Sequence, residues 1–150
     1  MVESFSPPAL PVNKGSPIKA IAIGALVDII GSMIIGSIYV IHYGILLSIR
    51  GLSIEKILNT IENIDPHSTF SIIGSSIGCL VSLLAGYLCA RIVNYSEYKF
   101  ASILGLISVI FGLAIGGSYY PTAGNLILVV LTFASVILGA YLHVKSKVET

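Results

Sequence analysis

Long apolar segments alternate with short polar or glycine-rich segments along this chain. The first apolar run contains a single acidic residue, Asp28, and the second runs from Thr69 with no charge before Arg91. A third stretch lacks charged side chains from Phe100 to Val144, and a Gly-Gly-Ser-Tyr-Tyr-Pro turn divides it. A helix needs about 20 consecutive apolar residues to span a bilayer. The pattern therefore predicts four membrane-spanning helices, over residues 18–50, 69–93, 97–118 and 122–144.

A shorter segment between the first two runs has a different pattern. Its apolar residues recur every three or four positions, as on one face of a helix, and the positions between them are polar. Ser53 can cap its start, and Asp65 with the following proline closes it. We expect an amphipathic helix over residues 53–65 at the membrane surface, with a solvated linker as the alternative. The apolar positions are Ile54, Ile57, Leu58, Ile61 and Ile64.

The two ends of the chain flank a transmembrane domain predicted over residues 18–144. Residues 1–17 contain four prolines, which remove backbone donors and block helix formation. This segment is therefore expected to be a flexible tail. Residues 145–150 are predicted as a second, shorter tail.

Composition supports an integral membrane protein. Of the 150 residues, 55% are hydrophobic and only 10% are charged, and the mean hydropathy is +0.97. Soluble domains contain about 45–50% apolar residues. The expected fold class is therefore an all-α polytopic membrane protein, with the lipid bilayer as its main partner. A net charge of +1 provides no electrostatic basis for binding nucleic acid.

Basic residues are unevenly divided between the two sides of the predicted spans. With four spans, the N-terminus, the loop between the second and third spans, and the C-terminus share one side. That side carries six of the eight basic residues, and basic loops favour the cytoplasm. We therefore predict that both termini are cytoplasmic. The six are Lys14, Lys19, Arg91, Lys99, Lys145 and Lys147, while Arg50 and Lys56 lie on the other side.

Small residues recur every fourth position in the predicted spans. Such residues let helix backbones approach closely, and this carries much of the helix packing in lipid. The second span has the longest stripe, so we expect it at the centre of the bundle and against the first span. A remaining stripe is a candidate for contact with another protein, so the expected protein partners are a second copy in a homo-oligomer or a larger membrane complex. The predicted packing residues are Gly24, Gly31 and Gly36 in the first span, Gly74, Gly78, Ser82 and Gly86 in the second, and Gly105, Gly112 and Gly116 in the third.

Asp28 lies well inside the first span. An ionised carboxylate near the centre of a bilayer costs at least about 2.5–3.5 kcal/mol unless something compensates it. Tyr87 and Arg91, one turn apart near the end of the second span, are predicted to satisfy Asp28, and Ser32 shares the Asp28 face of its helix. Two interpretations remain open. The cluster either locks the two helices together or forms a proton or cation site.

Signatures of enzymes are scarce. The sequence contains no HExxH, GxSxG, Walker A or CxxC motif, so we predict no catalytic residue, no cofactor and no metal site. Cys79 and Cys89 would lie about 15 Å apart along one helix, so they cannot pair with each other. Both are expected to be small packing residues.

One string is nevertheless similar to an enzyme motif. Residues 94–98 read Asn-Tyr-Ser-Glu-Tyr, which resembles the Asn-x-x-Glu-Tyr element of the membrane-associated eicosanoid and glutathione metabolism family. In that family an arginine precedes the asparagine by four residues, whereas this chain has Ala90 there and Arg91 one position later. The resemblance implies a glutathione-binding membrane enzyme as a remote alternative.

A second resemblance covers most of the chain. Residues 24–32 read G-A-L-V-D-I-I-G-S and residues 85–92 read A-G-Y-L-C-A-R-I. These strings are similar to G-L-x-V-D-x-G-[GS] and G-G-Y-x-A-A-R-I in a group of small four-span bacterial inner-membrane proteins of unknown function. The resemblance implies a bacterial inner-membrane location and a unit formed by Asp28, Tyr87 and Arg91. It implies no activity.

The leading functional expectation is a structural, scaffold or accessory membrane protein that self-associates. The alternative is a proton- or cation-coupled transporter or channel centred on Asp28. The architecture also resembles that of small multidrug-resistance transporters, which have four spans and one essential acid in the first helix, although here the acid is Asp. A dry Asp28 held by both partners would favour the structural role, whereas a wet cavity that reaches it from one side would favour transport.

Overall fold

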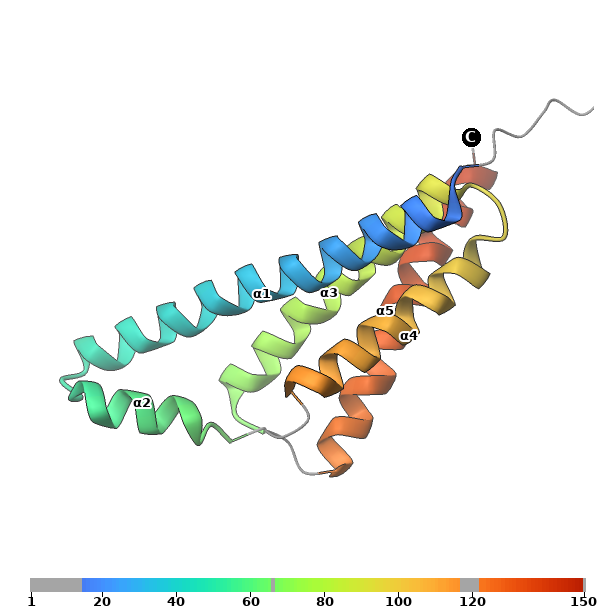
Figure 1. Ribbon diagram of the computed structural model, residues 1–150. Coiled ribbons are helices and arrows are strands. Elements are labelled where there is room, and N and C mark those ends of the chain that lie inside the picture. The colour runs from blue at the N-terminus through green and yellow to red at the C-terminus, as the bar shows by residue number, and fades with distance from the viewer. Residues whose placement is uncertain (1–14, 66, 117–121, 150) are drawn as a thin grey trace, which may run out of the picture.

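The computed structural model describes residues 15–65, 67–116 and 122–149. Within these residues all regular secondary structure is helical and forms five helices (Figure 1). This confirms the predicted all-α fold with four long helices and one short one. The helices are α1 Pro17–Ile49, α2 Ile54–Glu62, α3 Thr69–Val93, α4 Glu97–Gly116 and α5 Thr122–Val148.

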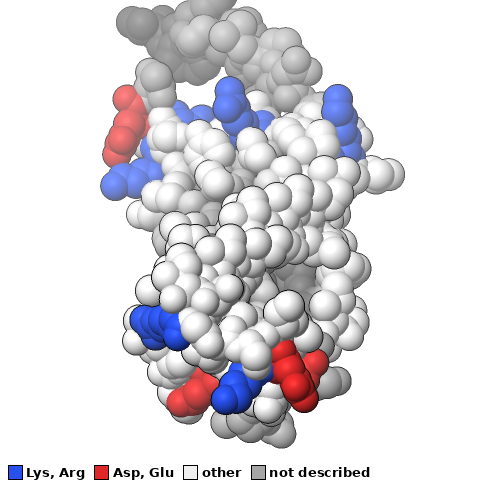
Figure 2. Space-filling model, turned by 90° about the vertical axis from the view of Figure 1, so that its left-hand side faces the viewer, with Lys and Arg blue, Asp and Glu red and all other residues white. Residues whose placement is uncertain are grey.

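The molecule has two ends that face opposite sides of a membrane. Four helices contain segments long and apolar enough to cross a bilayer, so the chain is a multi-pass membrane protein. Charged side chains gather at the two ends and leave an uncharged band between them (Figure 2). We call the end where α1 and α4 begin and α3 and α5 finish the terminal end, and the opposite one the distal end. The spans are Pro17–Ile49, Thr69–Val93, Glu97–Ile115 and Asn125–Val148.

Local sequence explains where the long helices start and stop. Ser16 caps α1 and Ser68 caps α3, since each side chain accepts a hydrogen bond from the backbone N–H three residues later, at 3.5 and 3.2 Å. After α1, Gly51 takes a φ of +81°, which glycine adopts without a steric penalty. Asn94 ends α3 in the left-handed conformation, with a φ of 55°.

The C-terminal end of the fold differs from the prediction. Residues 145–150 were expected to form a tail, but α5 continues to Val148. Lysines in the last turn of a helix interact favourably with its dipole, and Lys147 also forms an ion pair with Glu97 at 3.2 Å. The predicted tail over residues 1–17 lies almost wholly outside the described residues, and so does the turn over residues 117–121.

The short helix α2 is amphipathic, but its apolar face divides between two environments. Ile57 and Ile61 lie over Gly44 of α1, whereas Ile54 and Leu58 are 78% and 56% exposed. The first pair holds α2 against the bundle. The second pair is free to enter the membrane interface, as helices of this kind do.

The buried core lies toward the terminal end, where the helices approach one another most closely (Figure 1). Helix α3 contacts α1, α4 and α5, and its contacts with α5 and α1 are the most extensive in the bundle, which confirms its predicted central place. A Cβ atom added at Gly86 of α3 would overlap the backbone of α5 at Val136, so only glycine fits there. The fully buried residues of this apolar core are Ala20, Ala85, Cys89, Ala90, Val93, Ala101, Leu104, Val136 and Ala140.

The glycine stripe of α3 was expected to touch α1, and this prediction holds for only part of the stripe. Gly74 faces Tyr39 of α1, but Gly86 faces α5. Each step of four residues advances about 40° beyond a full turn of an α-helix, so three steps turn the stripe by about 120°. The glycines of this one stripe therefore contact two different helices, α1 and α5.

The other predicted packing glycines also fall into two groups. Gly24 of α1 lies against Leu104 of α4 and against α3, and Gly31 lies against α3. Gly105 of α4 lies against the ring of Phe133 in α5. In the second group, a Cβ added to the glycine would have no atom within 4 Å, leaving out its chain neighbours and the nearby backbone of its own helix. It comprises Gly36, Gly78 and Gly112. Gly116 ends α4 beside residues that the structure does not describe.

Candidate functional site

Asp28 is buried inside the bundle, with 5% of its surface exposed. The hydroxyl of Ser82 in α3 donates a hydrogen bond to Asp28 Oδ1 at 2.7 Å. This bond joins two spans that lie far apart in the sequence. Ser82 was predicted only as a packing residue, and it is the polar partner of the intramembrane acid.

The partners predicted for Asp28 are elsewhere. The ring of Tyr87 meets the ring of His143 in α5 edge to face, with centroids 5.4 Å apart, and Arg91 is exposed at the terminal end. Tyr87 is five residues beyond Ser82 on α3, and Arg91 is nine. At about 100° per residue these positions point about 140° and 180° away from Ser82. The predicted Asp28, Tyr87 and Arg91 cluster is therefore wrong, because only one face of α3 meets α1 at this depth.

Asp28 lies one turn beyond an apolar layer of the core. In that layer, a Cβ added at Gly24 would lie 2.7 Å from Cδ2 of Leu104 and 3.3 Å from Cβ of Cys89. Helices α1 and α4 both run from the terminal end to the distal end (Figure 1). One further turn on each helix, four residues from Gly24 and from Leu104, brings Asp28 level with Ser108.

Ser108 is an unusual buried hydroxyl. Its Oγ is inaccessible and has no hydrogen-bond partner within the described part of the chain, and the residue is only 6% exposed. Most buried polar side-chain atoms have a partner in the protein or an ordered water. Ser102, on the same helix, satisfies its own hydroxyl by donating to the carbonyl of Tyr98 at 2.8 Å. Ser108 makes no such bond.

A cavity of about 350 Å³ extends from Asp28 toward the distal end, and we call it the Asp28 cavity. All four spans line it, so it lies within the bundle. Gly78 and Gly112 line it too, and their missing side chains widen it. The polar residues that line it, besides Asp28, are Ser32, Ser75, Cys79, Ser82, Ser108 and Thr132, and the Oγ of Ser108 itself is inaccessible. The structure therefore does bring Ser32 together with Asp28, as predicted.

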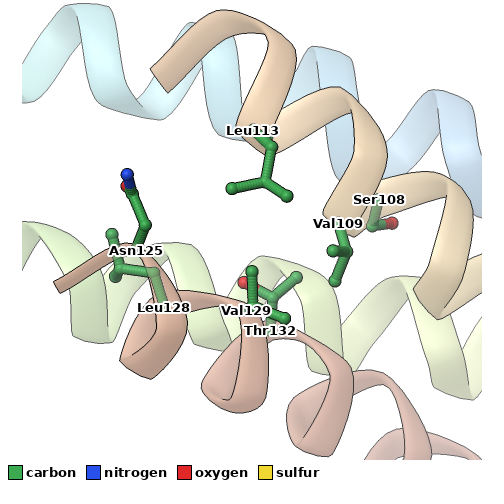
Figure 3. Close-up of a pocket in the computed structure, with 8 residues that line it drawn as sticks. Ser108, Val109, Leu113, Asn125, Leu128, Val129 and Thr132 are labelled. Atoms are coloured by element: carbon green, nitrogen blue, oxygen red, sulfur yellow. The ribbon is translucent and has the colours of Figure 1, made fainter. Parts of the chain in front are cut away.

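A second cavity, of about 170 Å³, continues between α4 and α5 (Figure 3). Figure 3 shows Val109 and Leu113 of α4 facing Thr132 of α5, with Ser108 near one end and Asn125 near the other. Both cavities share Ser108, Gly112, Leu128 and Thr132 as lining residues. The two cavities thus extend from Asn125, near the start of α5, to the level of Asp28, with apolar side chains between the polar ones.

On the opposite side of Asp28 the bundle is apolar and closed. Ala20, Ala85 and Leu104 are fully buried between Asp28 and the terminal end. Ion pairs among the described residues lie at the terminal end and join Lys147 to Glu97 and Lys145 to Glu149. Neither involves Asp28. The cavity beside Asp28 therefore lies on its distal side, and apolar packing closes its terminal side.

No family model, curated protein or solved structure matches this chain. Function must then be inferred from the Asp28 site itself. The string that resembles a glutathione-binding element forms the turn between α3 and α4. Asn94 caps α3, Ser96 has a φ of 47°, and the carboxylate of Glu97 accepts from Lys147. These residues thus have structural roles in the turn.

Sequence reasoning missed the hydroxyls on α4 and α5. Ser and Thr are tolerated in membrane helices because their hydroxyls can bond to a carbonyl one turn earlier, as Ser102 does. A single serine in an apolar span therefore gives no signal of its own. What marks Ser108 is its position relative to the apolar layer of the core. It lies four residues after Leu104, just as Asp28 lies four residues after Gly24.

Proposed function

We propose that this membrane protein binds a proton or a small cation at Asp28 and exchanges it with the distal side, in ion- or proton-coupled transport. One observation carries the proposal. Asp28 is buried at the closed end of a cavity lined by both apolar and hydroxyl-bearing side chains, and no basic side chain pairs with it in the described part of the chain. A cavity beside the acid is expected of an ion site, whereas a packing lock needs none.

Energetics support the same proposal. An ionised carboxylate at this depth costs at least about 2.5–3.5 kcal/mol. One interhelical hydrogen bond in a membrane contributes only about 0.6 kcal/mol on average, and about 1.7 at most. The bond from Ser82 therefore leaves most of the cost uncompensated. A bound proton or cation removes the remaining charge, and the cavity provides its way in and out.

The charge distribution supports an orientation for this exchange. The terminal end carries Lys19, Arg91, Lys99, Lys145 and Lys147 among the described residues. Basic loops favour the cytoplasm, so we place the terminal end there and the Asp28 cavity toward the opposite side. In a bacterium, the cavity would then face the side of the inner membrane opposite the cytoplasm.

A proteoliposome flux assay tests the proposal. Vesicles with wild-type protein should carry Asp28-dependent H⁺ or Na⁺ flux, and Asp28→Asn should lower that flux at least about ten-fold. The Asn side chain keeps an oxygen that can accept from Ser82, so the variant should insert and unfold like the wild type. Glu55→Gln is the matched control, because Glu55 is an exposed acid on α2 outside the cavity. Equal flux in the wild type and in Asp28→Asn would contradict the proposal.

A structural or scaffold role is the second candidate, and the bond between Ser82 and Asp28 favours it. That bond joins α1 to α3 inside the bundle. If Asp28 serves only this purpose, Asp28→Asn should reduce insertion, thermal stability or self-association, and no ion flux should depend on it. Chemical cross-linking in membranes would report the self-association that this candidate includes.

A further inference from the structure

We infer that an acyl chain of a phospholipid from the distal leaflet lies in a groove between α3 and α5, which we call the α3/α5 groove. The groove has a volume of about 570 Å³. Lipid binding at this place is separate from ion exchange at Asp28 and does not depend on it.

The α3/α5 groove lies next to the place where the two helices touch. Both helices run from the distal end to the terminal end (Figure 1). Their backbones meet around Gly86 and Gly139, where an added Cβ would overlap the neighbouring helix. The groove ends at Ser135, beside Val136, whose carbonyl group faces Gly86. It is therefore closed at the level of this tight contact and extends from there toward the distal end.

The groove is apolar and opens toward the bilayer. Ile72 and Leu80 of α3 and Ile127 and Leu131 of α5 line it and are between 44% and 61% exposed. The hydroxyl of Ser76 donates to the carbonyl of Ile72 at 2.8 Å, so it needs no partner in the groove. Apolar cavities stay dry, and an empty one loses the dispersion contacts of its lining. In a membrane, bilayer hydrocarbon is available to fill it.

The length of the groove matches one leaflet. Ile72 and Leu80 are eight residues apart on α3, and Ile127 and Ser135 are eight residues apart on α5, which corresponds to about 12 Å of helix. The hydrocarbon of one leaflet is about 15 Å thick, half of the bilayer core. His67, just before α3, is exposed and lines the groove at its distal mouth. A chain from the distal leaflet thus reaches the closed end while its headgroup stays at the level of His67.

The dimensions of the groove favour an acyl chain over a helix of another protein. A helix of this length and about 10 Å across occupies about 900 Å³, more than the groove provides. Helices in membranes also pack closely through small residues, whereas branched side chains such as Ile72 and Leu131 stand at the rims. An acyl chain is one methylene wide and flexible, so it enters between these rims.

A chain in this place also affects the Asp28 cavity. Ser75, Cys79 and Leu128 line both the α3/α5 groove and the Asp28 cavity. The bound chain covers the lipid-facing side of these three residues. It therefore separates the space beside Asp28 from the surrounding bilayer.

Photo-cross-linking of the full-length protein in phosphatidylcholine vesicles tests the inference. The probe is phosphatidylcholine with a diazirine in one acyl chain, and mass spectrometry locates the cross-links. Labelling at Leu80 should exceed labelling at Ile30 at least about ten-fold, the ratio expected for preferential binding in the groove. Ile30 is the reference because it is 47% exposed on α1 and lies at the same depth. Ile30 and Leu80 are each two residues from the hydrogen-bonded pair of Asp28 and Ser82, on its distal side.

Ser76→Phe places a ring in the groove and should lower labelling at Leu80 to the level at Ile30. Ile34→Phe is the matched control, because it introduces the same side chain at the depth of Ser76 on α1, a helix outside the described lining of the groove. It should leave labelling at Leu80 unchanged. Thermal unfolding of both variants shows whether either substitution disturbs the fold.

The wild type alone provides a second measurement, which does not depend on the folding of a variant. A diazirine near the headgroup should label Ile72 more than Leu80, and one near the end of the chain should label Leu80 more than Ile72. The reverse order would overturn the distal origin of the chain, and equal labelling of Leu80 and Ile30 would overturn its binding. Disulfide-linked dimers through Cys79 after mild oxidation would show that a second copy covers the groove, which would also overturn the inference. These measurements leave Asp28 unchanged, so ion flux tests the proposed function separately.

Discussion

The terminal and distal halves of the bundle use the same small residues to opposite effect. In the terminal half, Gly86 and Gly139 bring α3 and α5 so close that a Cβ atom on either glycine would overlap the neighbouring backbone. In the distal half, Gly78 and Gly112 face open space and line the Asp28 cavity. A glycine therefore permits close packing where helices converge and makes room where they diverge.

The comparison also shows why the acid lies where it does. Asp28 is one turn beyond the apolar layer formed around Gly24 and Leu104, at the boundary between the two halves. Further toward the terminal end it would be sealed among fully buried apolar side chains. Further toward the distal end it would lose the close approach of α3 that allows Ser82 to reach it at 2.7 Å. The boundary is where a buried carboxylate can have both a fixed position and a route to water.

The largest effect should come from the tight glycine of α3. Gly86→Ala places a methyl group into the backbone of α5, and we expect it to cost about 3 kcal/mol or more, at the upper end of overpacking effects. Gly78→Ala, eight residues earlier on the same helix, meets no atom within 4 Å. Its stability should match or exceed that of the wild type, because alanine favours helix over glycine by about 1 kcal/mol.

Thermal unfolding of the two variants in detergent, followed by size-exclusion chromatography, measures the difference. Similar losses in Gly86→Ala and Gly78→Ala would mean that both halves are equally close-packed. That result would remove the contrast on which the cavity depends.

The fold could largely be predicted because its signals are local. The four spans follow from the lengths of the apolar runs, and α2 follows from apolar positions such as Ile57 and Ile61 at helical spacing. The end of α5 could not be predicted, because it depends on a contact between Lys147 and Glu97, residues that are distant in the sequence. The course of the α3 stripe was missed because a spacing of four does not stay on one helix face.

The site was predicted in part for a related reason. A charged residue in a membrane span is conspicuous, so Asp28 and its neighbour Ser32 were identified from the sequence. Its partner was not, since the strongest counter-charge, Arg91, is on the opposite side of α3 from Ser82. Choosing between them required the register of α1 against α3, which no local pattern encodes.

A second prediction compares the two native cysteines, which lie on the same helix in different halves. Cys79 lines the Asp28 cavity, whereas Cys89 is fully buried in the apolar core. A small cationic methanethiosulfonate should modify Cys79 at least about ten times faster than Cys89, since Cys89 reacts only after the core opens. Mass spectrometry of the labelled protein measures both rates in one sample.

The charge of the reagent provides the control for this comparison. An anionic methanethiosulfonate of similar size should react with Cys79 more slowly than the cationic one, and Asp28→Asn should remove the difference. Equal labelling of Cys79 and Cys89 would show that the distal half is as closed as the terminal half. The cavity would then not be a route for ions.

The smallest effect should come from the ion pair at the terminal end. Lys147 approaches Glu97 at 3.2 Å and the carbonyl oxygen of Asn94 at 3.4 Å, so it links α5 to the turn between α3 and α4. The Lys147 side chain is 45% exposed, and pairs of this kind contribute about 0.2–1 kcal/mol. Lys147→Ala should therefore lower thermal stability only slightly. The loss should shrink further at about 1 M salt, where the Debye length falls to about 3 Å.

Lys145→Ala is the matched control, because Lys145 meets Glu149, the residue after the end of α5, at 3.9 Å and both side chains are more than half exposed. It removes one lysine from the same turn of α5 without breaking a contact between helices, so it should leave stability unchanged. If Lys147→Ala instead lowered thermal stability as much as Gly86→Ala, the ion pair between Lys147 and Glu97 would be the contact that holds the terminal half closed. The close packing of small residues inside the terminal half would then depend on that ion pair. Because salt screens the pair, adding salt would open the terminal side of Asp28.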